Sequence, residues 1–449
     1  MLFNSVEFIF LFLPGVLLAA RFLKGPALLR WITLSSFIFY ALAGRTWFLL
    51  PMLATTAFDF WLAPRIASAA TPERKKALLA VSVSASLGLL FYFKYAGLFL
   101  GSTFAVLLPA GISFYTFQTL AYVIDVYRGD AEPERDFWKF AGFVSFFPHL
   151  VAGPLTRHDQ LLPALGRIAA EGVKPRWQAG LFLFSVGLIK KVLIADRLAI
   201  LIDPMINDAA RLDAAAAWLA LLGYALQIYF DFSGYCDMAI GLGRLFGIEL
   251  PQNFNSPYQA KDPSDFWRRW HMTLSAWLRD YLYLPLGGRS FSAGRRYAAV
   301  MATMLLGGLW HGANWTFVAW GFYHGALIIG FHRTKSRWRS RPVILQRAAT
   351  FTLVTLGWVF FRSPDFHDAA LWLAALFDAR GLAAGLSAEH QPLLLLCVFG
   401  VTVTQWPRNA SGRTDWERLS PPFQTALGLA TVAAVLWANS GTEFLYFQF

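Results

Sequence analysis

The feature that most limits how this chain can fold is a series of apolar runs along its whole length. Runs near or above 18 residues with few charges predict membrane-spanning helices. Such runs, with shorter ones between them, occupy residues 6–23, 31–42, 47–62, 77–100, 107–126, 179–200, 218–248, 298–329, 343–361, 371–377, 393–406 and 423–437. We expect an all-α, polytopic membrane protein of about 11–12 transmembrane or re-entrant helices, forming one domain over residues 1–449.

The charged residues support a membrane protein rather than a nucleic-acid-binding one. Only 15% of residues are charged, against about 25% in soluble domains. The net charge of +12 comes from basic residues in short loops between apolar runs, not from a continuous basic face. The basic loops at 65–76 and 331–347 are predicted to be cytoplasmic, with the N-terminus outside.

Cysteine usage and the first residues exclude several classes. Cys236 and Cys397 lie in apolar runs, with neither a disulfide scaffold nor metal-ligand spacing, so buried free thiols and no metal site are expected. No basic residue precedes the first apolar stretch, which argues against a cleaved signal peptide.

Two apolar segments have unusual lengths. The run at 140–151 is too short to span a bilayer and is predicted to be re-entrant or buried. The run at 218–248 is too long for one span and contains Asp231, Asp237 and Arg244. Asp237 and Arg244 share one helical face. These charged residues could line a polar path, although pairing with one another is the preferred interpretation.

An aromatic stripe precedes the longest basic loop. Helical spacing relates the residues Trp267, Trp270, Leu274, Trp277, Leu278 and Tyr281. An interfacial helix with its rings at headgroup depth would explain the stripe, and so would a helix docked on the bundle. The stripe itself does not separate these two interpretations.

Two histidines are the leading functional candidates. His271 lies in the aromatic segment, and His311 lies inside a run that otherwise predicts membrane. An ionisable side chain in hydrocarbon is a functional hypothesis by default, the alternative being a hydrogen bond to a neighbouring helix. His324 lies roughly 220° further around the helix, so it is predicted to be structural unless Gly312 breaks that helix.

The distribution of polar residues favours an enzyme over a transporter. Transporters tend to carry matched broken helices in two halves, whereas here the polar residues concentrate between Asp231 and His311. The motifs GxSxG, HExxH and HxxxxD are absent. What remains is a histidine able to act as a base near neutral pH.

Several segments are similar to a known family. WRRWHMTLSAWLRDYLYLPLGG and LLGGLWHGANWTFVAWG resemble the signature of the membrane-bound O-acyltransferases. The same resemblance, closest to the alginate O-acetyltransferase branch, extends over FNSVEFIFLFLP, GISFYTFQTLAYVIDVYRG, FVSFFPHLVAGPLTR, YFDFSGYCDMAIGLGRLFGIELPQNFNSPY and the EFLYFQF end.

The resemblance implies interfacial helices around a central funnel or tunnel, with a catalytic histidine at the constriction. The family's essential histidine corresponds to His311, and its second motif histidine to His271, which would act in positioning and polar support. Trp310 belongs to the same motif as His311. Asn314, one turn further if the helix continues, could orient the ring, polarise a carbonyl or simply pack.

The resemblance also implies a reaction. A cytoplasmic acyl thioester such as acetyl-CoA would donate acetyl groups, with no bound cofactor, for O-acetylation of an exported polysaccharide at a bacterial inner membrane. Alginate is the leading acceptor, with cellulose and peptidoglycan as alternatives. A periplasmic acetyltransferase or esterase-like partner is implied too. Direct transfer, an acyl-protein relay, a lipid acceptor and a non-catalytic conduit for the acyl donor all stay open.

Overall fold

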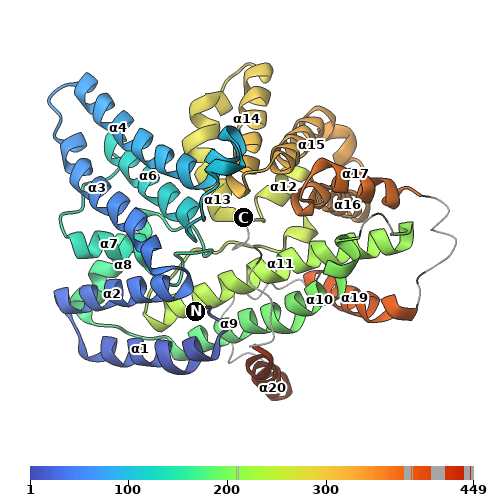
Figure 1. Cartoon of the computed structure of the whole chain (residues 1–449), viewed down its shortest axis with the longest axis horizontal. Coiled ribbons are helices and arrows are strands. Elements are labelled where there is room, and N and C mark those ends of the chain that lie inside the picture. Colours follow the sequence, from blue (N-terminus) through green and yellow to red (C-terminus); the bar gives the residue numbers. More distant parts are fainter. Residues whose placement is uncertain are drawn as a thin grey trace. The chain divides into compact units, whose positions relative to one another are not determined.

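Helices are the only regular secondary structure in the part of the chain that the computed structural model describes, which is residues 1–208, 210, 212–378, 386, 388–405, 420–438 and 445 (Figure 1). This confirms the predicted all-α class. Apart from Leu445, the EFLYFQF end lies outside the described residues.

The internal contacts divide the chain into two compact units. The first unit comprises Met1–Leu188, Tyr235–Pro251 and Thr414–Ser440. The second unit comprises Ile189–Gly234, Gln252–Arg413 and Gly441–Phe449. The single domain over 1–449 stays a prediction.

Antiparallel helix packing builds the first unit. Its helices are α1 (Leu13–Phe22), α2 (Gly25–Ala43), α3 (Leu49–Ala67), α4 (Pro72–Leu90), α5 (Ala96–Leu100), α6 (Ile112–Arg128), α7 (Phe137–Ser145), α8 (His158–Glu171), α9 (Trp177–Ile189) and α20 (Pro421–Trp437). Helices α3, α4 and α6 pack against one another, and α2 packs on α7 and α8 (Figure 1). Side-chain caps define some of the starts: Thr71 accepts from the Arg74 N–H, and Asp136 from the Trp138 N–H.

The segment that follows α7 is buried but not helical. Residues 146–156 are buried throughout, and side chains satisfy part of the local backbone. The Phe147 N–H donates to Ser36 Oγ at 3.1 Å, and Gln118 Nε2 donates to the Phe143 carbonyl at 2.9 Å. Irregular backbone inside a membrane body requires such partners. The prediction of a buried or re-entrant run at 140–151 is therefore confirmed.

The second unit contains the helices that carry both candidate histidines. They are α10 (Asp196–Ile206), α12 (Pro263–Trp267), α13 (Met272–Leu278), α14 (Ala293–His311), α15 (Trp315–Arg339), α16 (Val343–Arg362), α17 (Phe366–Leu376) and α19 (Gln391–Gln405), with the π-type segments η5 (Lys190–Ala195) and η8 (Arg279–Gly288). Helix α14 packs along α15, and α15 packs on α16.

The aromatic stripe does not lie on one helix. Helix α12 ends at Trp267, and α13 begins only at Met272. Trp270, Leu274 and Trp277 are buried, so this segment is packed into the second unit. The docked interpretation is favoured over an interfacial helix with rings at headgroup depth.

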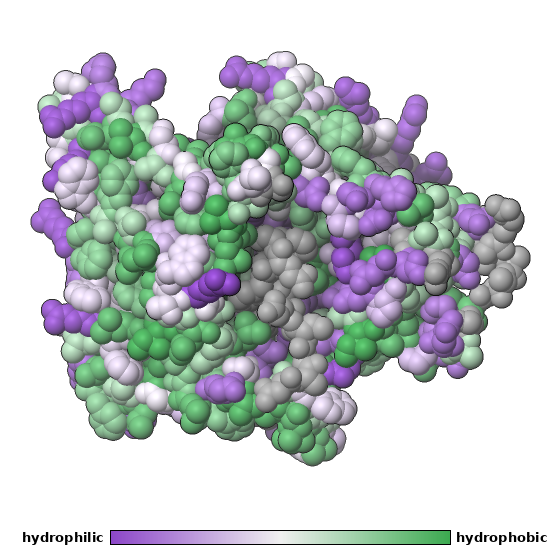
Figure 2. Space-filling view, viewed as in Figure 1, coloured by the Kyte–Doolittle hydropathy of each residue, from purple (hydrophilic) through white to green (hydrophobic). Residues whose placement is uncertain are grey.

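Six described helices are long and apolar enough to cross a membrane: Gly25–Ala43, Thr46–Ala67, Pro72–Leu100, Trp177–Ile206, Ala214–Leu245 and Val343–Arg362. The first unit exposes many large apolar side chains, such as Leu18 and Phe22 on α1, and hydrophobic residues cover much of its visible face (Figure 2). The run at 218–248 forms part of one unbroken helix, α11 (Ala214–Leu245), of 32 residues. It can exceed the length of a span because protein, not lipid, buries most of it.

Candidate active site

His311 lies at the tip of a helical hairpin. Helix α14 ends at His311, and the extended backbone of Gly312 (φ −160°, ψ 151°) terminates it. Helix α15 begins at Trp315, directly after Asn314. Asn314 is its N-cap, because the Asn314 side chain accepts from the Thr316 N–H at 3.1 Å. Gly312 therefore breaks the helix between His311 and His324.

Two glycines bring the arms of this hairpin into backbone contact. A Cβ atom on Gly308 would lie 2.2 Å from the Phe317 carbonyl oxygen, and one on Gly321 would lie 2.3 Å from the Met304 carbonyl oxygen. Small residues permit such close approach of membrane helices. The position of His311 therefore depends on how tightly α14 and α15 pack.

Substituting Gly308 with alanine should separate the two arms. We expect a loss of about 1–3 kcal/mol from overpacking, seen as a lower thermal midpoint in detergent together with reduced acyl transfer. Gly330→Ala on α15 is the matched control, because no atom lies within 4 Å of its added Cβ. Equal midpoints and activities for Gly308→Ala and Gly330→Ala would contradict close packing of α14 and α15.

Aromatic rings surround the His311 imidazole. Ring centroids lie 5.0 Å away for Trp310, 5.1 Å for Trp320 and 5.2 Å for Phe361. All three rings meet the imidazole at steep angles, the usual edge-to-face geometry. The imidazole itself is only 5% exposed. Such an enclosure keeps bulk water away from the ring.

His311 also lines a cavity of about 500 Å³. The apolar part of the wall includes the side chains Met272, Leu274, Leu278, Val300, Met304, Trp320 and Ile328. Ser264, Arg268, Arg279 and His332 add polar groups to the same wall. A mostly apolar cavity with a few polar groups is typical of a small-molecule site.

His271 reaches the same neighbourhood from the turn between α12 and α13. Its ring lies 4.7 Å from the Phe232 ring and 6.0 Å from that of Trp310. Trp310 therefore contacts both histidine rings. His271 lies outside the candidate spans, and burial lowers the pKa of its imidazole to about 3. The ring is neutral at physiological pH.

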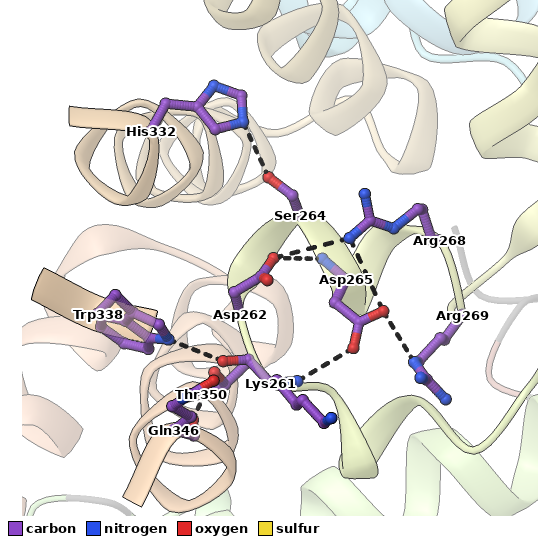
Figure 3. A network of polar contacts seen from close by, with 10 residues as sticks. All are labelled: Lys261, Asp262, Ser264, Asp265, Arg268, Arg269, His332, Trp338, Gln346 and Thr350. Carbon is purple, nitrogen blue, oxygen red and sulfur yellow. Dashed lines mark hydrogen bonds and ion pairs between the residues drawn. The ribbon is translucent and has the colours of Figure 1, made fainter. Parts of the chain in front are cut away.

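A polar network fixes the start of the segment that leads to His271 (Figure 3). Trp338 Nε1 donates to the Lys261 carbonyl at 2.7 Å, and Ser264 Oγ lies 3.1 Å from His332 Nε2. Asp262 caps α12 by accepting from the Asp265 N–H at 2.7 Å. These contacts attach α12 to α15, which forms another wall of the cavity.

Asn314 does not occupy the place that a continuous helix would give it. Because the helix ends at His311, Asn314 is not one turn further along the same face. Its Oδ1 caps α15, and its Nδ2 donates to the Pro364 carbonyl. Both groups are used on the backbone, so Asn314 supports the turn beside His311. Its role in orienting the ring or polarising a carbonyl stays a prediction.

Asp231 and Arg244 of α11 both pair with residues outside this helix. In the second unit, Asp231 pairs with Lys191 at 2.7 Å, and Lys191 also pairs with Asp196 at 2.8 Å. In the first unit, Arg244 pairs with Glu249 at 3.1 Å, and Asp237 is buried. The preferred pairing within the α11 set is therefore wrong for Asp231 and Arg244. Whether the three residues line a tunnel stays a prediction.

His324 is fully buried on α15, against the rings of Trp267 (5.2 Å) and Trp320 (4.9 Å). Although Gly312 breaks the helix, His324 is not among the residues that line the cavity. Its structural role stays a prediction.

Sequence reasoning did not single out several residues of this site. Trp320 and Phe361 enclose His311, and Asn253 contacts His271. Aromatic residues are too common in this chain for any one ring to be conspicuous. Nothing in the sequence separates Asn253 from the other polar residues of the loop at 250–261.

Comparisons with known proteins identify the family to which the chain is similar. The model of the membrane-bound O-acyltransferase family matches residues 134–361. The chain is 38% identical to a probable alginate O-acetylase of Pseudomonas putida, over all of both chains. It is 34% identical to a peptidoglycan O-acetyltransferase of Helicobacter pylori, over 100% of this chain and 98% of the relative. A teichoic acid D-alanyltransferase of Bacillus subtilis is 26% identical over 57% of this chain and 69% of its own length.

Fold, candidate spans and relatives together define a multi-pass membrane enzyme that transfers acyl groups. The chain belongs to the membrane-bound O-acyltransferase family.

Proposed function

We propose that the enzyme moves acetyl groups from a cytoplasmic acyl thioester across the bacterial inner membrane, for O-acetylation of an exported polysaccharide, with His311 as the catalytic residue. One observation carries the proposal: the His311 ring is almost completely buried among aromatic rings, yet it lines a cavity large enough for a small acyl donor. Burial of that kind suits proton transfer without access of bulk water.

The chemistry requires a base. The pKa of an acceptor hydroxyl is far above 7, so its oxygen attacks a thioester carbonyl only if its proton is removed as the bond forms. A ring nitrogen of His311 takes that proton while the new C–O bond forms. The C–S bond then breaks, and the departing thiolate takes the proton back as a thiol. General base catalysis of this kind contributes about 10²–10⁴-fold in rate.

The cavity wall supports a thioester donor. Its apolar lining suits an acyl group. Arg268 and Arg279, each of which also pairs with a neighbouring aspartate, would favour the negative charge that carriers of thioesters bear. The same site serves a direct transfer and a relay through an acyl-protein intermediate. In a relay, a periplasmic acetyltransferase or esterase-like protein would complete the reaction.

The acceptor is proposed from the relatives. The names alginate O-acetylase and peptidoglycan O-acetyltransferase both describe acetylation of an extracytoplasmic polymer. Alginate is our first choice because that relative has the higher identity over the whole chain. Peptidoglycan is the second candidate, favoured by a full-length relative of 34% identity.

Deleting the gene tests the acceptor. Mass spectrometry of the exopolysaccharide and the peptidoglycan should show loss of O-acetyl groups from the exopolysaccharide alone, restored by a plasmid copy. Loss from peptidoglycan alone would favour the second candidate. Unchanged acetylation of both polymers would contradict the proposal.

Reconstituted vesicles separate the enzyme from other classes. Vesicles with the purified protein receive radiolabelled acetyl-CoA or palmitoyl-CoA, with the polymer on the opposite side. We expect acetyl label on the polymer, or on the partner protein when it is included. Palmitoyl transfer to lipid would instead identify a lipid-acceptor enzyme. Passage of intact donor without any transfer would identify a conduit.

A further inference from the structure

The amide of Asn253 makes three contacts with the turn that carries His271. Asn253 Oδ1 accepts from the Thr273 N–H at 3.2 Å and from the Thr273 hydroxyl at 2.9 Å. The same oxygen lies 3.2 Å from His271 Nδ1. Asn253 is 0% exposed and His271 is 1% exposed. Because water is excluded, these contacts determine which tautomer the His271 ring adopts.

The contacts determine which ring nitrogen of His271 carries the proton. A backbone N–H can only donate, so the Asn253 atom that faces Thr273 must be the oxygen, and a flipped amide is excluded. An amide oxygen cannot donate. The hydrogen between Asn253 Oδ1 and His271 therefore belongs to Nδ1. In a neutral imidazole, this leaves Nε2 with its lone pair, as an acceptor.

The backbone around Asn253 holds the same turn. The Met272 N–H donates to the Asn253 carbonyl at 2.9 Å, and the Asn255 N–H donates to the Arg269 carbonyl at 2.9 Å. These two bonds flank His271, whose φ of +43° lies in the left-handed region that residues with a Cβ seldom adopt. Asn253 thus fixes both the backbone and the ring of His271.

We propose that Asn253 is a positioning residue that holds His271 as the Nδ1–H tautomer, so that His271 serves the reaction as a hydrogen-bond acceptor through Nε2. This deepens the function proposed above and rests on it. An acceptor nitrogen can hold the hydroxyl of an incoming sugar or protein side chain. It cannot donate to the oxyanion that forms from the thioester carbonyl. In this role, His271 binds the acceptor substrate and not the oxyanion.

Nitrogen NMR tests the tautomer without any activity measurement. The protein is labelled with ¹⁵N-histidine in nanodiscs, and a His271→Asn sample identifies the His271 signals by difference. We expect a protonated Nδ1 and an unprotonated Nε2 from pH 5 to 8, because burial lowers the pKa of His271 to about 3. In Asn253→Leu we expect the Nε2–H form to gain population. A wild-type Nε2–H tautomer, or no change in Asn253→Leu, would overturn the proposal.

Two substitutions of Asn253 separate positioning from simple structural support. Asn253→Leu removes the acceptor and should lower kcat/KM for acyl transfer by about tenfold or more, as loss of the correct tautomer does in other enzymes. Asn253→Asp keeps an acceptor oxygen and should recover part of that loss above pH 8. The matched control is Asn255→Leu, since the Asn255 side chain is exposed and the residue contacts Arg269 through its backbone. Its kcat/KM should stay within about twofold of wild type.

The pH profile of Asn253→Asp has a definite direction. A carboxylate beside His271 favours the imidazolium and raises its pKa. Protonation at Nε2 then removes the acceptor at higher pH than in the wild type, so the acidic limb of kcat/KM should move upward. A uniform loss at every pH in both Asn253 variants would mean structural support only and would overturn the proposal. His311→Gln is assayed in parallel. If it stays active, the proposed function fails, whereas the NMR measurement tests the tautomer of His271 independently.

Discussion

Replacing His311 with glutamine should abolish acyl transfer while the protein still folds and inserts. Glutamine is close to histidine in size and keeps a polar group among the side chains of Trp310, Trp320 and Phe361. It cannot accept a proton at neutral pH. We expect transfer to fall by about 10²–10⁴-fold, the usual contribution of a general base. Radiolabelled acetyl incorporation in proteoliposomes measures the loss.

Two controls make this result interpretable. His367→Gln carries the same change at an exposed position on α17 and should keep wild-type activity. A thermal midpoint of His311→Gln within a few degrees of wild type shows that the enclosure has survived. Substantial transfer by a well-folded His311→Gln protein would remove His311 from the chemistry and favour a conduit.

Replacing Lys191 with methionine should have the largest effect on stability. The Lys191 side chain is 0% exposed and contacts two carboxylates, Asp196 and Asp231, whose side chains are 0% and 3% exposed. Asp231 also accepts from the Leu445 N–H at 3.0 Å. Methionine matches the length of lysine but leaves both carboxylates buried without their cation. Breaking a buried ion pair from one side costs about 3–5 kcal/mol.

The thermal midpoint and the yield of monodisperse protein in detergent would register this loss. Lys174→Met is the matched control, because Lys174 pairs with Glu171 at the surface, with side-chain exposures of 74% and 49%. Such pairs contribute about 0–1 kcal/mol. Adding Asp196→Asn and Asp231→Asn to Lys191→Met should restore part of the stability, since no buried charge then lacks its partner. Equal midpoints for the two lysine variants would contradict this account.

The sequence was sufficient for the helical class and, through the resemblance, for the family, but not for the shape of the hairpin that carries His311. The length of an apolar run and the spacing of charges can be read from one segment at a time, and they predict the helices that the structure contains. Gly312 was ambiguous because glycine occurs within helices as well as at their ends. Gly312 ends α14, and Asn314, two residues later, is the N-cap of α15. The two residues together explain the break.

Partnerships between distant segments could not be predicted. Helical spacing relates Asp237 to Arg244 because they lie on one helix, but it says nothing about Lys191, 40 residues before Asp231. The aromatic stripe suggested a single helix for a related reason. Trp267 and Trp270 keep helical spacing across a turn that is not helical, and both rings contact the buried Phe266.

The left-handed backbone at His271 bears on any attempt to make this enzyme more thermostable. A residue with a Cβ in that conformation costs about 1–2 kcal/mol relative to glycine. Engineering schemes that search for relaxed backbone geometry would therefore mark this turn for replacement. Under the role that we propose for His271, heat tolerance and turnover make opposite demands on this one position, so the turn should be exempt from such redesign.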